Sequence, residues 1–99
     1  PDAIKRRLEE VGLDVCTSTA CSESSDITAD DEAGRRQGVD YLKECIKVTA
    51  GMGATVFTGV TYSALGRKID TMPDESYWER AAKGLKEAAR YAGDLGVTV

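Results

Sequence analysis

The chain contains 99 residues, of which 41% are hydrophobic and 30% are charged, the balance of an ordinary soluble globular protein. Its formal net charge of −4 argues against a nucleic-acid surface, because such a surface needs a basic stripe that displaces counterions from phosphates. No apolar stretch approaches the roughly 20 residues that span a bilayer, so we expect a cytoplasmic protein without nucleic-acid or membrane partners.

The first half of the chain predicts a short helix, a strand and a longer helix. Ile4, Leu8 and Val11 recur on one face of a helix that ends at Gly12. A strand is predicted over residues 13–18, and a polar stretch rich in turn-forming residues follows it. The next helix is predicted over residues 31–51. Its expected inward face consists of Val39, Leu42, Ile46 and Thr49.

The second half of the chain repeats this order of elements. A strand is predicted over residues 54–59, followed by a long connection over residues 60–73 and a helix over residues 74–94. Residues 97–99 are β-prone and begin a further strand. The expected inward face of this last helix consists of Trp78, Ala82, Leu85, Ala89 and Ala92.

Three glycines mark a repeat in which a helix ends and a strand follows within a few residues. Gly12, Gly53 and Gly96 lie at intervals of 41 and 43 residues. Eight such units make a chain of about 200 to 400 residues, which is the size of a (β/α)8 barrel. We therefore expect residues 1–99 to be an internal sector of one TIM-barrel domain. In such a sector the three strands are adjacent and parallel, and all three helices lie on one face of the sheet.

The lengths of the connections indicate where a ligand would bind. The helix-to-strand joins are only a residue or two around a glycine, whereas the strand-to-helix joins are much longer. In β/α folds, ligands bind where the carboxyl ends of the strands emerge, and long loops on one side of a fold usually serve binding. The binding side is therefore expected to carry residues 18–22 and 60–64.

Several specific kinds of chemistry are excluded from these residues. The chain has no histidine, which removes Ser-His-Asp and Cys-His nucleophiles and most catalytic metal sites. Cys16, Cys21 and Cys45 form no C-x-x-C pair, so we expect reduced thiols and neither a disulfide framework nor a zinc ribbon. The G-x-G at residues 51–53 closes a helix and precedes a strand, which is the wrong polarity for a dinucleotide-binding loop.

Acidic residues and glycines at the helices have structural explanations. The acids of residues 23–32 lack the spacing of a calcium loop, and the last of them suit the cap and first turn of a helix. Asp74 and Glu75 are expected to do the same at the next helix rather than to form a catalytic pair. Gly34, Gly38 and Gly84 lie inside helical patterns, which indicates close approach of the helix to the sheet or to a neighbouring helix.

Three motifs together resemble one enzyme family. Residues 25–43 (SDITADDEAGRRQGVDYLK) resemble the segment after the third strand of the ketose 3-epimerases, in which an acidic loop leads into an R-x-x-G-h-x-Y-L-K helix start. Residues 58–64 (TGVTYSA) are similar to the family's G-G-x-L-Y-S element after the fourth strand, and residues 77–80 (YWER) to its W-E-R helix opening. The resemblance to these D-tagatose, D-psicose and L-ribulose 3-epimerases covers nearly the whole chain.

The resemblance implies a xylose isomerase-like barrel, of which this chain would cover the helix before the third strand through the start of the fifth. Family members epimerise ketoses at C3 through an enediolate, using a divalent metal, usually manganese or cobalt. Two glutamates, an aspartate and a histidine hold that metal, and by alignment all four lie beyond Val99. The resemblance therefore implies that this chain carries no catalytic or metal-binding residue and binds no metal itself. We expect the chain to be inactive alone. The parent enzyme is expected to be a homo-oligomer.

The resemblance also implies which residues could line the sugar pocket. Ala20 matches a substrate-contacting position at the tip of the third strand, and Val60 and Thr61 match such positions after the fourth, with Thr19 and Tyr62 beside them. Thr61 stands where the family usually carries leucine, and Thr19 and Ala20 replace a common His-Gly or Phe-Gly pair. Both departures leave the identity of the ketose open.

Two other interpretations compete with the C3-epimerase. Another enzyme of the same superfamily, of the hydroxypyruvate isomerase or inosose dehydratase type, would share the fold and the metal but not the reaction. The alternative from a different class is a non-catalytic α/β binding or assembly module. The sequence alone decides neither the substrate nor whether the chain folds by itself.

Overall fold

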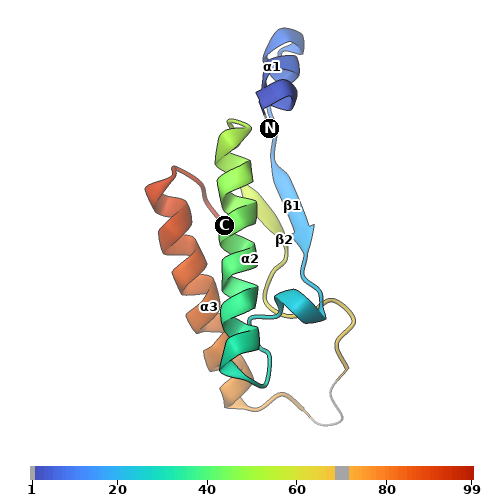
Figure 1. Ribbon diagram of the computed structural model, residues 1–99, viewed down its shortest axis with the longest axis vertical. Coiled ribbons are helices and arrows are strands. Elements are labelled where there is room, and N and C mark those ends of the chain that lie inside the picture. Colours follow the sequence, from blue (N-terminus) through green and yellow to red (C-terminus); the bar gives the residue numbers. More distant parts are fainter. Residues whose placement is uncertain (1, 69–71) are drawn as a thin grey trace.

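The computed structural model of this chain describes residues 2–68 and 72–99. Its elements alternate between helix and strand, as the sequence predicts. In chain order they are α1 (Asp2–Val11), β1 (Thr17–Ala20), the 3₁₀ turn η1 (Glu23–Ser25), α2 (Glu32–Gly51), β2 (Phe57–Val60) and α3 (Glu75–Asp94). Figure 1 shows α2 and α3 side by side next to the strands, whereas α1 stands beyond one end of them.

The strands form a small parallel sheet in the predicted order. In the ladder between β1 and β2, Thr17 lies opposite Phe57 and Ala20 lies opposite Val60. The predicted third strand is present as a single parallel bridge between Val56 and Thr98. The amide of Phe57 donates to the carbonyl of Thr98 at 2.9 Å. The three segments are therefore adjacent and parallel, with residues 54–59 in the middle.

The observed strands begin later than the sequence pattern predicts. The prediction placed the first strand at residues 13–18, but β1 begins at Thr17, where the chain first meets Phe57 of β2. Leu13 lies outside the ladder and its side chain is 64% exposed. A strand exists only where a partner accepts its backbone hydrogen bonds, and β-propensity does not show where that partner begins.

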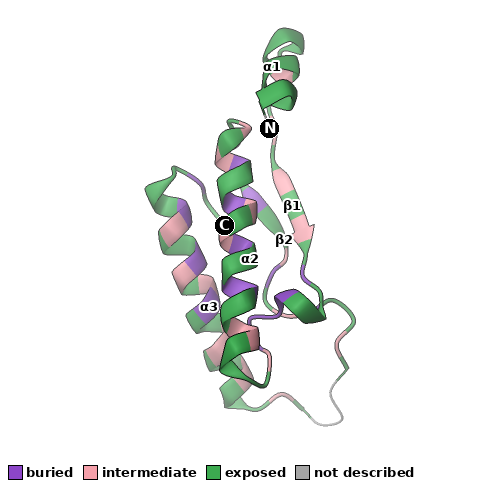
Figure 2. Ribbon diagram, viewed as in Figure 1, coloured by how far each residue is buried: buried purple, intermediate pink, exposed green. Residues whose placement is uncertain are grey.

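The hydrophobic core lies between the sheet and the two long helices. All four residues predicted for the inward face of α2 are buried: Val39, Leu42, Ile46 and Thr49. Val39, Leu42 and Ile46 pack with Phe57 of β2 and with Ala88 and Ala92 of α3. Figure 2 shows buried positions along both α2 and α3. Both crossover helices therefore cover the same face of the sheet. That arrangement is expected for a barrel sector and is not found in a doubly wound sheet, where successive helices alternate between faces.

The inward face of α3 differs from the prediction. Its buried residues are Gly84, Ala88 and Ala92, whereas Trp78 is 67% exposed. The cause is Ile27, which is inserted between α2 and α3 and lies so close to Gly84 that a Cβ there would be 2.9 Å from the Ile27 side chain. The smallest residues of α3 must face this insertion. Trp78 is therefore turned to an adjacent, open side, and its prediction as a core residue is wrong. The prediction also fails at Ala82 and Ala89, which are exposed, whereas Leu85 packs half-buried against the core and Ala92 is buried as predicted.

Helix α1 also departs from the prediction that all three helices cover one face of the sheet. It is amphipathic, but none of its residues is buried, and Ile4 is 55% exposed. Within residues 2–68 and 72–99, no element covers its apolar side (Figure 2). Amphipathicity predicts that a helix has a face to bury, but it does not identify the element that buries it.

The acidic residues at the helix starts act as caps, as predicted. The Asp31 carboxylate accepts a hydrogen bond from the amide of Gly34 at 3.2 Å, and the Asp74 carboxylate accepts one from the amide of Ser76 at 2.9 Å. The close approach predicted at Gly38 is also present, although its partner is a loop. A Cβ there would lie 2.7 Å from the backbone of Asp26, so α2 packs directly on the β1–α2 loop.

Candidate functional site

The carboxyl ends of β1 and β2 bring two predicted pocket residues together. Ala20 is the direct partner of Val60 in the ladder, and the amide of Cys21 donates to the carbonyl of Val60 at 2.9 Å. Phe57, three residues before Val60, points into the core under α2 and α3. Because side chains alternate along a strand, Ala20 and Val60 face the opposite side of the sheet, which neither long helix covers.

Thr19 faces the helices. Its hydroxyl oxygen lies 2.7 Å from the hydroxyl oxygen of Tyr41 in α2. Two residues earlier, the hydroxyl of Thr17 lies 2.6 Å from that of Thr49, also in α2. The threonines of β1 thus fasten the strand to α2, while Ala20 is turned the other way. A contact between Thr19 and a sugar stays a prediction, and in this structure its hydroxyl already has a partner.

Gly59 allows the two strand ends to approach. Its φ is +126°, a region that favours glycine, and a Cβ at this position would lie 1.9 Å from the carbonyl oxygen of Thr19. No side chain fits in that space without separating the strands. In the sequence, Gly59 lies within the family-like motif of residues 58–64, with no role predicted for it. The positive φ inside a strand is the feature that identifies its role, and this φ is visible only in the structure.

Thr61 and Tyr62 continue from β2 in different environments. Thr61 is buried, with 8% of its surface exposed, whereas Tyr62 is 56% exposed. Tyr62 lines an apolar groove of about 460 Å³ between the β2–α3 connection and α3, together with Tyr77 and Trp78. The structure thus places Tyr62 at an accessible, largely apolar groove, whereas Thr61 is buried and does not line that groove.

A charge network around the buried Asp26 joins the two loops beside Tyr62, and no pattern in the sequence predicted it. The Asp26 side chain is 4% exposed and accepts hydrogen bonds from the amide and the hydroxyl of Thr28 at 2.8 and 2.6 Å. Its second oxygen lies 2.8 Å from Nη1 of Arg67. Burial raises the pKa of the Asp26 carboxyl, but the bonds from Thr28 and Arg67 and the Arg67 charge outweigh it, so the pKa is lowered.

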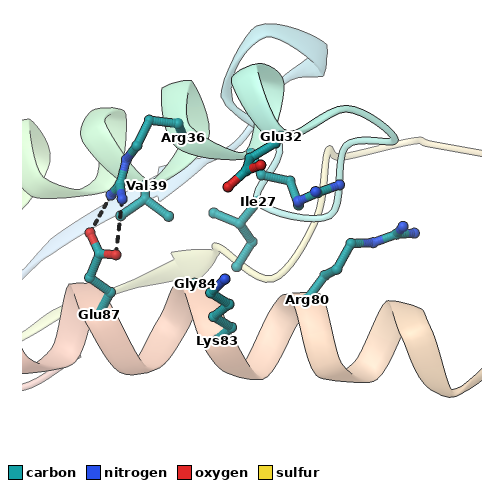
Figure 3. Close-up of a pocket in the computed structure, with 9 residues that line it drawn as sticks. Ile27, Glu32, Arg36, Val39, Arg80, Lys83, Gly84 and Glu87 are labelled. Carbon is teal, nitrogen blue, oxygen red and sulfur yellow. Dashed lines mark hydrogen bonds and ion pairs between the residues drawn. The ribbon is translucent and has the colours of Figure 1, made fainter.

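A second cavity, of about 90 Å³, lies on the outer side of the molecule between α2 and α3. Figure 3 shows Ile27 and Gly84 beside it, with Arg36 and Glu87 joined by two hydrogen bonds across the helices. Lys43 adds a 2.8 Å ion pair to Glu87. The hydrogen bonds from Arg36 and Lys43 lower the pKa of the Glu87 carboxyl to about 2. The predicted pocket residues do not line this cavity, and its ion pairs join the two helices.

The groups that would carry metal or nucleophilic chemistry are not assembled here. Within residues 2–68 and 72–99, no three histidine, cysteine, aspartate or glutamate side chains gather as a metal site. Cys21 is buried, and burial raises the pKa of its thiol, so that the reactive thiolate is disfavoured. No helix of this described part combines the length and apolarity needed to cross a membrane.

Comparisons with known proteins agree with this geometry. An L-ribulose 3-epimerase of Mesorhizobium japonicum is 27% identical over 97% of the chain, and a ketose 3-epimerase of Arthrobacter globiformis is 33% identical over 96%. The chain covers 32% of each relative, so it spans about a third of their length.

Solved structures give the same result. An L-ribulose 3-epimerase structure superimposes with a TM-score of 0.91 at 28% identity, covering 97% of this chain and 32% of that one. A D-allulose 3-epimerase from Methylomonas sp., crystallised with D-allulose, has a TM-score of 0.86 at 28% identity and covers 94% of this chain and 32% of its own.

The family described as xylose isomerase-like TIM barrel matches residues 1–99. The parallel strands, with both long helices on one face, are the corresponding sector of that fold. This chain belongs to the xylose isomerase-like TIM barrel family.

Proposed function

We propose that this chain is one sector of a ketose 3-epimerase, in which it forms part of the wall of the sugar pocket. The observation that carries the proposal is the adjacency of Ala20 and Val60 at the carboxyl ends of two parallel strands, on the face that the helices leave open. In β/α barrels, active sites are built at the carboxyl ends of the strands. The ketose and L-ribulose 3-epimerases that are similar along the whole chain support the choice of reaction.

Epimerisation at C3 requires that a proton be removed from one face of the sugar and returned to the other. The residues at the strand ends are suited to shape and contact instead. Ala20 and Val60 offer apolar surface, and Tyr62 offers an exposed ring with a hydroxyl group. We assign to them the binding and orientation of the ketose, and to residues elsewhere in the complete enzyme the proton transfer through an enediolate.

The metal proposed for this reaction, manganese or cobalt, does not fit the residues described here. A divalent ion of this class needs several carboxylate or imidazole ligands, and the chain has no histidine. The buried carboxylate of Asp26 already accepts hydrogen bonds from Thr28 and Arg67. We therefore propose that other parts of the complete enzyme bind the metal and that this chain alone is inactive.

The direct test is proton exchange at C3 in the complete enzyme that contains this sector. The enzyme would be incubated with D-fructose, D-tagatose or L-ribulose in deuterium oxide, with and without manganese and a chelator. NMR should show the C3 epimer of at least one ketose, deuterium at C3 of the product, and loss of turnover with the chelator. The isolated 99-residue chain should show neither turnover nor a manganese-dependent rise in melting temperature.

Three outcomes would contradict the proposal. Conversion of hydroxypyruvate, with no C3 epimer formed from any ketose, would indicate an isomerase of another type in the same superfamily. Release of water from an inosose would indicate a dehydratase. If the complete protein converts no sugar and retains a stable fold, a binding module becomes the better interpretation.

A further inference from the structure

Arg67 joins three segments near the carboxyl ends of the strands. Its Nη1 lies 2.8 Å from a carboxylate oxygen of Asp26 and 2.9 Å from the carbonyl oxygen of Thr28. Its Nη2 lies 3.2 Å from a carboxylate oxygen of Asp30 and 3.5 Å from the hydroxyl of Tyr77. One side chain of the β2–α3 connection therefore contacts both the β1–α2 loop and the first turn of α3.

This network is stronger than a surface ion pair. Asp26 is almost fully buried, and both of its oxygens are engaged, one by Thr28 and the other by Arg67. The guanidinium also lies 5.3 Å from the centre of the Tyr77 ring. A planar guanidinium can reach several acceptors at once, which a lysine ammonium cannot do. Loss of Arg67 would leave the Asp26 charge buried with only Thr28 as partner, which is costly.

The network lies beside the proposed pocket edge, since Arg67 and Thr28 line the same groove as Tyr62. The amide of Leu65 donates to the carbonyl of Cys21 at 2.8 Å, which is a second tie between the same two loops. Residues 61–64 are therefore held at one end by β2 and at the other by Leu65 and Arg67. Tyr62 lies within this short segment, and Ala20 immediately precedes Cys21. The loop that carries Tyr62 is thus fixed relative to Ala20 before any sugar arrives.

We infer that Arg67 is a positioning residue that, with Asp26, holds the two strand-to-helix loops in the arrangement that binds the sugar. The inference rests on the proposed function. Arg67 acts through Asp26 and the loops, since its guanidinium is committed to the network. A wall that is held in place before binding spares the ordering cost when the sugar arrives, so its loss should weaken substrate binding more than it slows turnover.

The test uses Arg67→Lys in the complete enzyme, with Arg36→Lys as the matched control. Arg36 also pairs with a carboxylate, that of Glu87, but it joins two helices on the outer side of the sector. Arg67→Lys should raise KM for the ketose about three- to tenfold and leave kcat within about twofold. Arg36→Lys should leave both constants unchanged. Asp26→Asn, which keeps the shape of the side chain and removes its charge, should reproduce the rise in KM.

Amide hydrogen exchange supplies a readout that does not depend on activity. Peptides from residues 21–31 and 61–68 should exchange faster in Arg67→Lys than in the wild type, whereas peptides from α2 should not. In Arg36→Lys the two loops should exchange as in the wild type. Folding of each variant would be checked by circular dichroism before kinetics are measured.

The two proposals fail in different ways. If the wild type epimerises a ketose but Arg67→Lys and Asp26→Asn both keep its KM, the positioning role is overturned and the proposed function stands. If the wild type acts on no ketose, the proposed function fails and the effect on sugar binding fails with it. In that case, unchanged amide hydrogen exchange of the two loops in Arg67→Lys would also show that Arg67 does not hold the loops together.

Discussion

The two faces of the β1–β2 sheet differ in what covers them and in which residues they carry. The face toward α2 and α3 carries Phe57, which is 1% exposed, and the threonines of β1 that bond to α2. The other face carries Ser18, Ala20 and Thr58, all exposed, and the half-buried Val60. Adjacent residues of the same strand therefore lie in opposite environments.

This difference separates two tasks. The covered face contributes the buried apolar area that stabilises the sector, since stability grows with the area removed from water. The other face is the inner side of the barrel, and at the carboxyl ends of the strands its side chains can face a ligand. Substitutions on the covered face should therefore change stability, and those at the carboxyl end of the open face should change substrate use. Two predictions test this division, and a third concerns the ion pairs that lie outside both faces.

The largest expected effect is on the covered face. Phe57→Ala should lower the stability of the complete enzyme by about 3–5 kcal/mol, because it leaves a cavity among Leu42, Ile46 and Ala92. Val60→Ala, a truncation on the other face of the same strand, should cost about 1 kcal/mol or less. Urea unfolding followed by circular dichroism would measure both. Equal losses for the two variants would mean that the faces do not differ in this way.

The second prediction concerns substrate use on the open face. Val60→Phe should lower kcat/KM for the ketose by about tenfold, because a larger side chain at the strand end narrows the pocket. Val56→Phe is the matched control, since Val56 directly precedes β2 at its amino end and, four residues before Val60, shares its face by the alternation of side chains. It should leave the kinetic constants unchanged. If the two variants impair the enzyme equally, or if neither does, the pocket edge has been placed at the wrong end of β2.

The smallest expected effect concerns Glu87, which links α2 and α3 outside both faces. Its pKa is lowered to about 2 by the hydrogen bonds from Arg36 and Lys43. A carboxyl whose pKa is lower in the folded state stabilises the fold above its usual pKa, here 4.5, and loses this contribution as the pH falls toward 2. Because its side chain is 39% exposed, water screens the pair, and the contribution should be about 0.2–1 kcal/mol.

Glu87→Gln should therefore be less stable than the wild type at pH 6, and the difference should shrink between pH 4.5 and 2. Urea unfolding at several pH values would measure it. Glu44→Gln, at an exposed acid of α2 that forms no ion pair within the described residues, is the control and should show no such pH-dependent difference. A constant difference for Glu87→Gln across this range would disprove the electrostatic origin.

Much of the architecture follows from local patterns in the sequence. The spacing of Val39, Leu42, Ile46 and Thr49 predicted the buried side of α2, and all four are buried. Asp31 and Asp74 were predicted as caps and act as such. The helix ends at glycines predicted the order of helix and strand. Each of these features depends on residues within one or two turns of each other, so a single sequence is enough to reveal them.

Other features depended on residues that are far apart in the chain. Trp78 is exposed because Ile27, some fifty positions earlier, occupies the space beside Gly84. The sequence pattern placed Val60, Ala20 and Thr19 on the binding side, but the ladder register decided that Ala20 meets Val60 and that Thr19 turns to Tyr41. The pairing of Arg67 with Asp26 has no signal in either segment alone.

The sequence by itself therefore determined the order of the elements, the inward face of α2 and the helix caps, whereas the side on which a ligand would bind stays a prediction. Tertiary structure alone decided the strand limits, the face that α3 buries and the charge network that joins the loops. The physical reason is the range of the interactions. Helix periodicity and capping are satisfied within a few residues, whereas strand pairing, close packing at a glycine and a buried ion pair each need a partner that the fold brings from elsewhere.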